Sequence, residues 1–135
     1  SGVMHPLLAE SVTQFQAQAY NELLPSQGPV KTQVIGMATP ETEQQASRVQ
    51  EFMNYQLMQV MREYDSETDQ MLFYLPLSGS AFRKVYYDQN LGRAVSKFIP
   101  SEDLIVPYGA TDLHSATRIT HVINMSMSVH AWKSI

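Results

Sequence analysis

A pair of β-rich runs in the second half of the chain limits its fold more than any other feature. Residues 81–88 read AFRKVYYD, residues 94–99 read AVSKFI, and the loop QNLGR separates them. Two such runs around a short loop that contains asparagine and glycine predict a β-hairpin over 81–99. A turn and a short apolar run at 104–106 predict a further strand, and the alternation in TRITHVINM, 117–125, predicts another. We therefore expect a small, mainly antiparallel β-sheet.

Helical periodicity dominates the first half of the chain. One helix is predicted over 7–24, a second from Thr39-Pro40-Glu41 to about Tyr64, and a third over 66–77. Threonine can cap the first free amides of the second helix, and proline is tolerated at its first position. The first apolar stripe comprises Leu8, Val12, Phe15, Ala19 and Leu23, and the second comprises Ala46, Val49, Met53, Leu57, Val60 and Tyr64. A weakly alternating run between the first two helices, VKTQVIGM at 30–37, predicts a strand.

Helices followed by strands indicate an α+β fold, with the amphipathic helices packed on the sheet. We expect the stripe of 46–64 to cover the sheet that contains the hairpin. The length of 135 residues suits one domain, which we assign to residues 4–135. Residues 1–3 are set aside because Ser1-Gly2 before Val3 resembles the scar of a cleaved tag. The chain ends without a closing element, so we expect it to be a fragment of a longer subunit.

Composition excludes several classes of function. The net charge of −4 argues against a dedicated nucleic-acid-binding module, which would carry a basic face. The absence of cysteine excludes disulfides, a thiolate zinc site and a cysteine nucleophile. No apolar run approaches the roughly 20 residues that span a bilayer, so we expect no membrane partner.

Motifs for catalysis or cofactor binding are missing from the sequence. The scattered glycines form no phosphate-binding pattern, and Ser78-Gly79-Ser80 lacks the flanking glycines of a nucleophile elbow. The histidines show no zinc-ligand spacing. We therefore predict no catalytic residue, no metal and no cofactor. A small hydrolase that uses His121 or His114 with Asp112 is kept as a further hypothesis, which requires these side chains to converge in one pocket.

The predicted hairpin mixes basic and aromatic residues. Basic and aromatic side chains on strands can bind nucleic acid through phosphate attraction and base stacking. The candidate contacts are Arg83, Lys84, Arg93 and Lys97. Strand alternation places Phe82 and Lys84 on one face and Arg83 on the other, which counts against a single binding platform. A nucleic-acid-binding hairpin is therefore the alternative function.

Several strings resemble one known family, the portal proteins of tailed bacteriophages. They are MLFYLPLSGSAFRKVYYD, VSKFIPSEDLIVPYGATDL and RITHVI, preceded by VKTQVIG and TPETEQQASRVQEFMNYQLMQVM. The resemblance extends from about Val30 to Met125, and the LPLSGSAF–KVYYD–PSEDLIVPYGATDL succession is its most specific part. The final residues, SMSVHAWKSI, depart from the family pattern.

The resemblance implies a structural role in a virion rather than an enzyme. Portal subunits form a ring, typically a dodecamer, at one capsid vertex, and double-stranded DNA passes through it during packaging and ejection. The full-length protein would contact terminase, neck or tail proteins and the capsid, and would be present in host cytoplasm during assembly. This chain would correspond to part of the wing region of one subunit.

Overall fold

The computed structural model describes residues 6–125, and it confirms the predicted α+β class. The helices are α1 (Leu7–Leu23), α2 (Pro40–Tyr55) and α3 (Glu63–Ser78), with a π-helical segment at Gln56–Val60. The strands are β1 (Ala81–Asp88), β2 (Arg93–Pro100), β3 (Leu104–Ile105) and β4 (Thr120–His121), with a 3-10 turn at Ser101–Asp103. None of the helices in this part of the chain is long and apolar enough to cross a bilayer.

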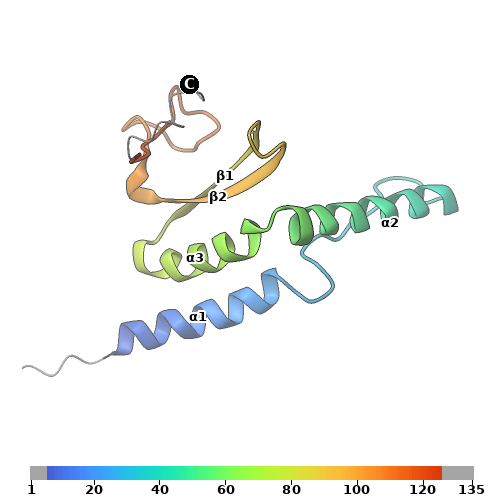
Figure 1. The fold of residues 1–135 in the computed structure, drawn as a ribbon, viewed down its shortest axis with the longest axis horizontal. Coiled ribbons are helices and arrows are strands. Elements are labelled where there is room, and N and C mark those ends of the chain that lie inside the picture. The colour runs from blue at the N-terminus through green and yellow to red at the C-terminus, as the bar shows by residue number, and fades with distance from the viewer. Residues whose placement is uncertain (1–5, 126–135) are drawn as a thin grey trace, which may run out of the picture.

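Helix α3 is the centre of the packing. It lies between α1 on one side and the β1–β2 hairpin on the other, and Figure 1 shows these three layers stacked in that order. Thr68 and Leu72 of α3 are buried, as are Val12 of α1 and Ile99 of β2. The expectation that the helix over 46–64 covers the hairpin is therefore wrong. Helix α3 covers it, while α2 extends beyond the layers (Figure 1) and buries none of its residues.

The start of α2 follows the sequence prediction closely. Thr39 precedes the helix in an extended conformation, and its hydroxyl accepts a hydrogen bond from the backbone N–H of Thr42 at 3.3 Å. The Thr42 hydroxyl in turn accepts from the Thr39 backbone N–H at 2.9 Å, which completes a capping box. Pro40 occupies the first helical position, where its missing N–H has no intrahelical partner to lose.

The predicted continuation of this helix to Tyr64 is wrong. After Tyr55 the backbone passes into the π-helical segment, and the helical path then breaks at Met61, whose φ is −82° and ψ 76°. Helix α3 begins at Glu63, earlier than the predicted Ser66. Met61 is buried at this break, so the chain turns around an apolar anchor rather than around a glycine or proline.

The end of α3 is marked by Gly79, while Pro76 removes one hydrogen bond near the end of the helix because it has no N–H. Pro76 lies in the last turn, and Gly79 adopts the left-handed conformation at φ 81°. Its backbone N–H donates to the Leu75 carbonyl at 2.9 Å. The chain then enters β1 directly.

The run 30–37 is not a strand, contrary to its prediction. Its backbone lies against α2, where side-chain amides take the place of a neighbouring strand. The Val30 N–H donates to Asn54 Oδ1 at 2.8 Å, Asn54 Nδ2 donates to the Val30 carbonyl at 3.1 Å, and the Thr32 N–H donates to Gln50 Oε1 at 3.1 Å. Gly28, at φ 98°, approaches this clamp so closely that an added Cβ would lie 2.4 Å from Asn54 Cγ.

Antiparallel pairing is confirmed, but it forms two small sheets rather than one. The hairpin pairs Ala81 with Pro100 at one end and Asp88 with Arg93 at the other. The second sheet pairs only Leu104–Ile105 with Thr120–His121. The predicted strand over 117–125 is therefore wrong for most of its length, because only Thr120 and His121 pair with another strand.

Candidate functional site

The four basic residues predicted for the hairpin divide into two pairs with different surroundings. Arg93 Nη1 lies 2.9 Å from both carboxylate oxygens of Glu63 at the start of α3. Arg83 Nη2 donates to Thr68 Oγ1 at 2.6 Å, and its guanidinium stacks on the Tyr64 ring, 4.6 Å from its centroid. Both arginines are therefore engaged by α3.

The two lysines lie on the hairpin face opposite to that of Arg83, a face that the register also assigns to Arg93 at the hairpin tip. Lys84 and Lys97 are directly opposite each other in the β1–β2 register, and both are exposed. Because side chains alternate between faces and the neighbouring Arg83 contacts α3, the lysines point away from α3. The Lys84 ammonium lies 5.2 Å from the centroid of the Tyr86 ring. The structure thus brings two of the four candidates together, and nucleic-acid binding by them stays a prediction.

Two glutamates of α3, one turn apart, close the outer edge of β2. Glu63 Oε1 accepts from the Ser96 backbone N–H at 3.3 Å, and Glu67 Oε2 accepts from the Phe98 backbone N–H at 2.5 Å. We call this pair the carboxylate clasp. Edge amides that would otherwise be open to another strand are satisfied by side chains of the same chain.

The electrostatics of the clasp favour an ionised carboxylate. The hydrogen bond from Arg93 lowers the pKa of Glu63 below its ordinary value of 4.5, against the opposing effect of partial burial. The same bond raises the pKa of Arg93 above its ordinary value. No sequence motif pointed to Glu63. The available sequence pattern was a pair of acidic residues four positions apart, Glu63 and Glu67. Acidic residues are common near the N-terminus of any helix, so this pair does not stand out.

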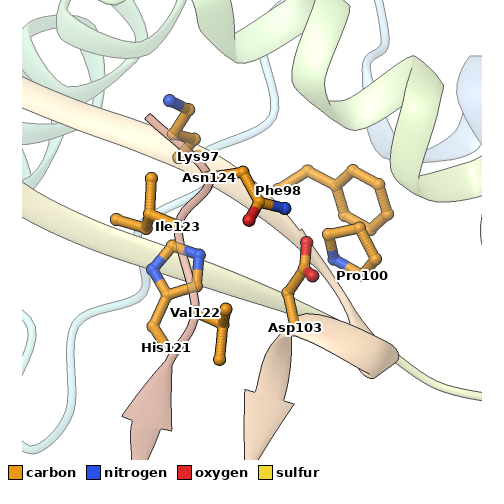
Figure 2. Close-up of a pocket in the computed structure, with 8 residues that line it drawn as sticks. All are labelled: Lys97, Phe98, Pro100, Asp103, His121, Val122, Ile123 and Asn124. Atoms are coloured by element: carbon orange, nitrogen blue, oxygen red, sulfur yellow. The ribbon is translucent and has the colours of Figure 1, made fainter. Parts of the chain in front are cut away.

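A hollow of about 290 Å³ lies between β2 and the segment that follows β4. Figure 2 shows Phe98, Pro100 and Asp103 on one side of it, His121 and Ile123 on the other, and Asn124 between them. The Val122 backbone N–H donates to the Asp103 carbonyl at 2.9 Å, which holds the two sides together. Lys97 also lines this hollow. Its lining is about equally polar and apolar, and its ionisable residues are Lys97, Asp103 and His121.

His121 also lines a second, more apolar hollow of about 410 Å³. That hollow is bounded by Phe82, Ile99, Leu104, Leu113 and Ile119, with Arg83 and Lys84 at its margin. The Nδ1 atom of His121 is buried and makes no hydrogen bond with the residues that the structure describes. His121 therefore packs beside the segment that connects β3 and β4.

The predicted hydrolase residues have other partners. The Asp112 carboxylate accepts from the Ser115 backbone N–H at 2.7 Å and from the Ser115 hydroxyl at 2.8 Å. These bonds lower the pKa of Asp112 below its ordinary value. Neither Asp112 nor His114 is among the residues that line the two hollows beside His121. Between residues 6 and 125, no cluster of three or more histidine, aspartate or glutamate side chains could hold a metal ion.

Exposed apolar side chains run along two helices. On α1, Leu8 is 64% exposed and Leu23 is 50% exposed, although both belong to the apolar stripe of this helix. On α2, Val49 is 53% and Phe52 is 61% exposed. A groove of about 480 Å³ separates the end of α2 from the tip of the hairpin, lined by Phe52, Met53, Gln56, Leu57, Val60, Met61, Tyr87, Gly92, Arg93 and Ala94.

Comparison with models of known protein families, with curated proteins and with solved structures gives no match. The fold and its surfaces define a class only: an α+β module whose helices present apolar side chains to their surroundings.

Proposed function

We propose that this chain is a structural and interaction module that works by assembly with other subunits. The observation that carries the proposal is the exposure of α2. This helix has a strong N-terminal cap and an apolar stripe, yet it buries no residue within the described part of the chain. An amphipathic helix gains most of its stability from burial of its apolar face, so its natural partner is another surface.

The particular assembly that we propose is the portal ring of a tailed bacteriophage, with this chain as part of the wing. The support is the sequence resemblance between Val30 and Met125, above all the succession from Leu75 to Leu113. In this proposal other portal subunits contact the exposed helices, and double-stranded DNA passes through the channel of the complete ring. Terminase, neck or tail proteins and the capsid would contact other parts of the full-length subunit.

Native mass spectrometry and negative-stain imaging of the full-length protein test the ring. We expect closed rings, and a stable monomer under all conditions would contradict the proposal.

A pair of variants in the full-length protein tests the role of α2. Val49→Asp places a charge on an exposed residue of the apolar stripe, so we expect ring formation to decrease. Gln44→Asp places the same charge on an exposed polar position on the opposite side of the same helix and should leave the rings intact. Circular dichroism of both variants checks that the subunit remains folded. Equal ring formation by the two variants would show that this stripe is not an assembly surface.

A further inference from the structure

The two outer edges of the hairpin are covered differently. On β2, the clasp residues Glu63 and Glu67 accept hydrogen bonds from the backbone N–H groups of Ser96 and Phe98. These amides therefore point away from β1 and toward α3. The edge of β2 is closed by the chain itself.

The register of the hairpin then fixes the direction of the backbone groups on β1. In an antiparallel pair, two residues directly opposite each other point their backbone groups either at each other or both outward. Val85 is opposite Ser96 and Arg83 is opposite Phe98, so both point their N–H and C=O groups outward. Alternation extends this pattern to Tyr87, which is opposite Ala94.

This outer edge of β1 is most open around Val85 and Tyr87, whereas Leu113 and Ile119 share a hollow with residues 82–84 nearer the start of the strand. Within residues 6–125, no hydrogen bond from outside the β1–β2 ladder reaches the backbone of Arg83, Val85 or Tyr87. The side chains of Val85 and Tyr87 are 64% and 65% exposed. An edge strand with free donors and acceptors is a template for the addition of another strand.

The charge on the hairpin selects which strand can be added. Lys84 and Lys97 form a like-charged cross-strand pair on the face away from α3, an arrangement that is unfavourable by itself. Lysine on an open edge discourages pairing with apolar or basic strands. A carboxylate on an added strand, placed beside Lys84, would instead relieve the repulsion.

We propose that the outer edge of β1 receives an extended acidic strand from a partner protein, in which carboxylate and apolar residues alternate. The carboxylates lie beside Lys84, and the apolar side chains lie beside Val85 and Tyr87. This inference rests on the proposed function of the chain as an interaction module, and it names the partner chemistry for one surface.

The probe is a short synthetic peptide of alternating valine and glutamate, blocked at both ends, titrated into the chain at low salt. NMR spectra should show shifts centred on the amides of Arg83, Val85 and Tyr87, and slower hydrogen exchange at those amides. A peptide with lysine in place of glutamate should bind about tenfold more weakly, because attraction at the two lysines becomes repulsion. Shifts centred on β2 or the helices, or no binding of the acidic peptide, would overturn the proposal.

Two variants separate the backbone contribution from the charge. Val85→Pro removes an outward N–H without touching the β1–β2 ladder and should abolish binding, whereas the matched variant Val85→Ala keeps the N–H and should retain most of it. Lys84→Glu leaves the backbone unchanged and should reverse the preference between the two peptides. Equal binding by Val85→Pro and Val85→Ala would rule out strand addition.

Other outcomes distinguish this inference from the ring proposal. Protection of the β1 amides that rises with protein concentration, without peptide, would assign the edge to a second copy of the chain and reject the acidic strand. Intact rings without peptide binding would reject only the role of the edge. Peptide binding by a subunit that never forms rings would reject only the portal assignment.

Discussion

At the scale of single residues, side chains of one chemical type have unlike roles in this chain. Arg83 and Arg93 contact side chains of α3, whereas Lys84 and Lys97, on the face opposite to that of Arg83, are exposed. The sequence groups all four by charge and spacing. It could predict that they share a hairpin, and strand alternation could separate Arg83 from Lys84. It could not predict Glu63 or Thr68 as partners, because contacts between distant elements depend on how α3 lies against β2.

Glu63→Gln is expected to lower stability in a pH-dependent way. Glutamine keeps an acceptor for the Ser96 amide but loses the charge that pairs with Arg93, at a cost of about 1 kcal/mol at neutral pH. Because the pKa of Glu63 is lowered in the folded state, the ionised form stabilises the fold above the ordinary value of 4.5, and this stabilisation disappears as the pH falls through the lowered pKa. Urea unfolding between pH 7 and acid pH measures the effect.

The control for this variant is Glu102→Gln. Glu102 accepts a hydrogen bond from the neutral Tyr74 hydroxyl at 3.0 Å, so its neutralisation should change stability less. A stability difference between wild type and Glu63→Gln that stays constant down to strongly acid pH would contradict the role of the ion pair.

At the scale of elements, the caps and turns were predictable from the sequence, whereas the packing neighbours of each helix and strand were not. The cap at Thr39, the hairpin and the end of α3 depend on residues near one another in the chain, and all three were predicted. The run 30–37 has the composition of a strand, but the amides of Asn54 and Gln50 occupy the place of a neighbouring strand. The helix break at Met61 carries no glycine or proline signal, so periodicity alone extended α2 across it.

Gly79→Ala is expected to destabilise the chain by about 1–2 kcal/mol, since alanine tolerates the left-handed conformation at φ 81° poorly. Gly109 provides a matched control, because it does not have a positive φ and an added Cβ there would meet no atom within 4 Å. Thermal or urea unfolding of Gly79→Ala and Gly109→Ala should show a clear loss only for the first. Equal losses of stability in the two variants would show that the left-handed conformation of Gly79 is not the cause.

Asn54→Ala is expected to release the segment before α2. The substitution removes both hydrogen bonds to Val30, so the amide of Val30 should exchange with solvent much faster while α3 and the hairpin remain protected. Gln45→Ala, on an exposed part of the same helix, should leave Val30 unchanged. Unchanged exchange at Val30 in Asn54→Ala would show that other contacts hold the segment.

At the scale of the whole molecule, one layered body carries the buried residues and one helix stands apart from it. The body consists of α1, α3 and the hairpin, and α1 is fastened to α3 by polar bonds as well as by Val12. Tyr20 donates to Asp65, and Gln16 Nε2 donates to Asp69 Oδ1 at 2.6 Å. The bond to Asp65 raises the pKa of Tyr20. The α+β class was predictable from the order of the elements. The exposure of α2 was not, because it depends on which helix packs against the hairpin, and that helix is α3.

Two substitutions on α1 should separate the stability of the isolated chain from the association of the full-length protein. Val12→Ala removes buried methyl groups and should destabilise the chain by about 2 kcal/mol in urea unfolding. Phe15→Ala, at a side chain that is 42% exposed, should cost the isolated chain much less but reduce association of the full-length protein. A larger loss of chain stability for Phe15→Ala than for Val12→Ala would contradict this division of the helix.

The closeness of Gly28 to Asn54 restricts the order in which mutations can accumulate in descendants of this sequence. A side chain at position 28 collides with the amide that holds Val30, so that substitution is costly while Asn54 is present. Loss of the amide at position 54 has to come first, and even then the φ of 98° at position 28 favours glycine, asparagine or aspartate. In relatives of this chain, a residue other than glycine at position 28 should therefore occur only where position 54 is no longer asparagine.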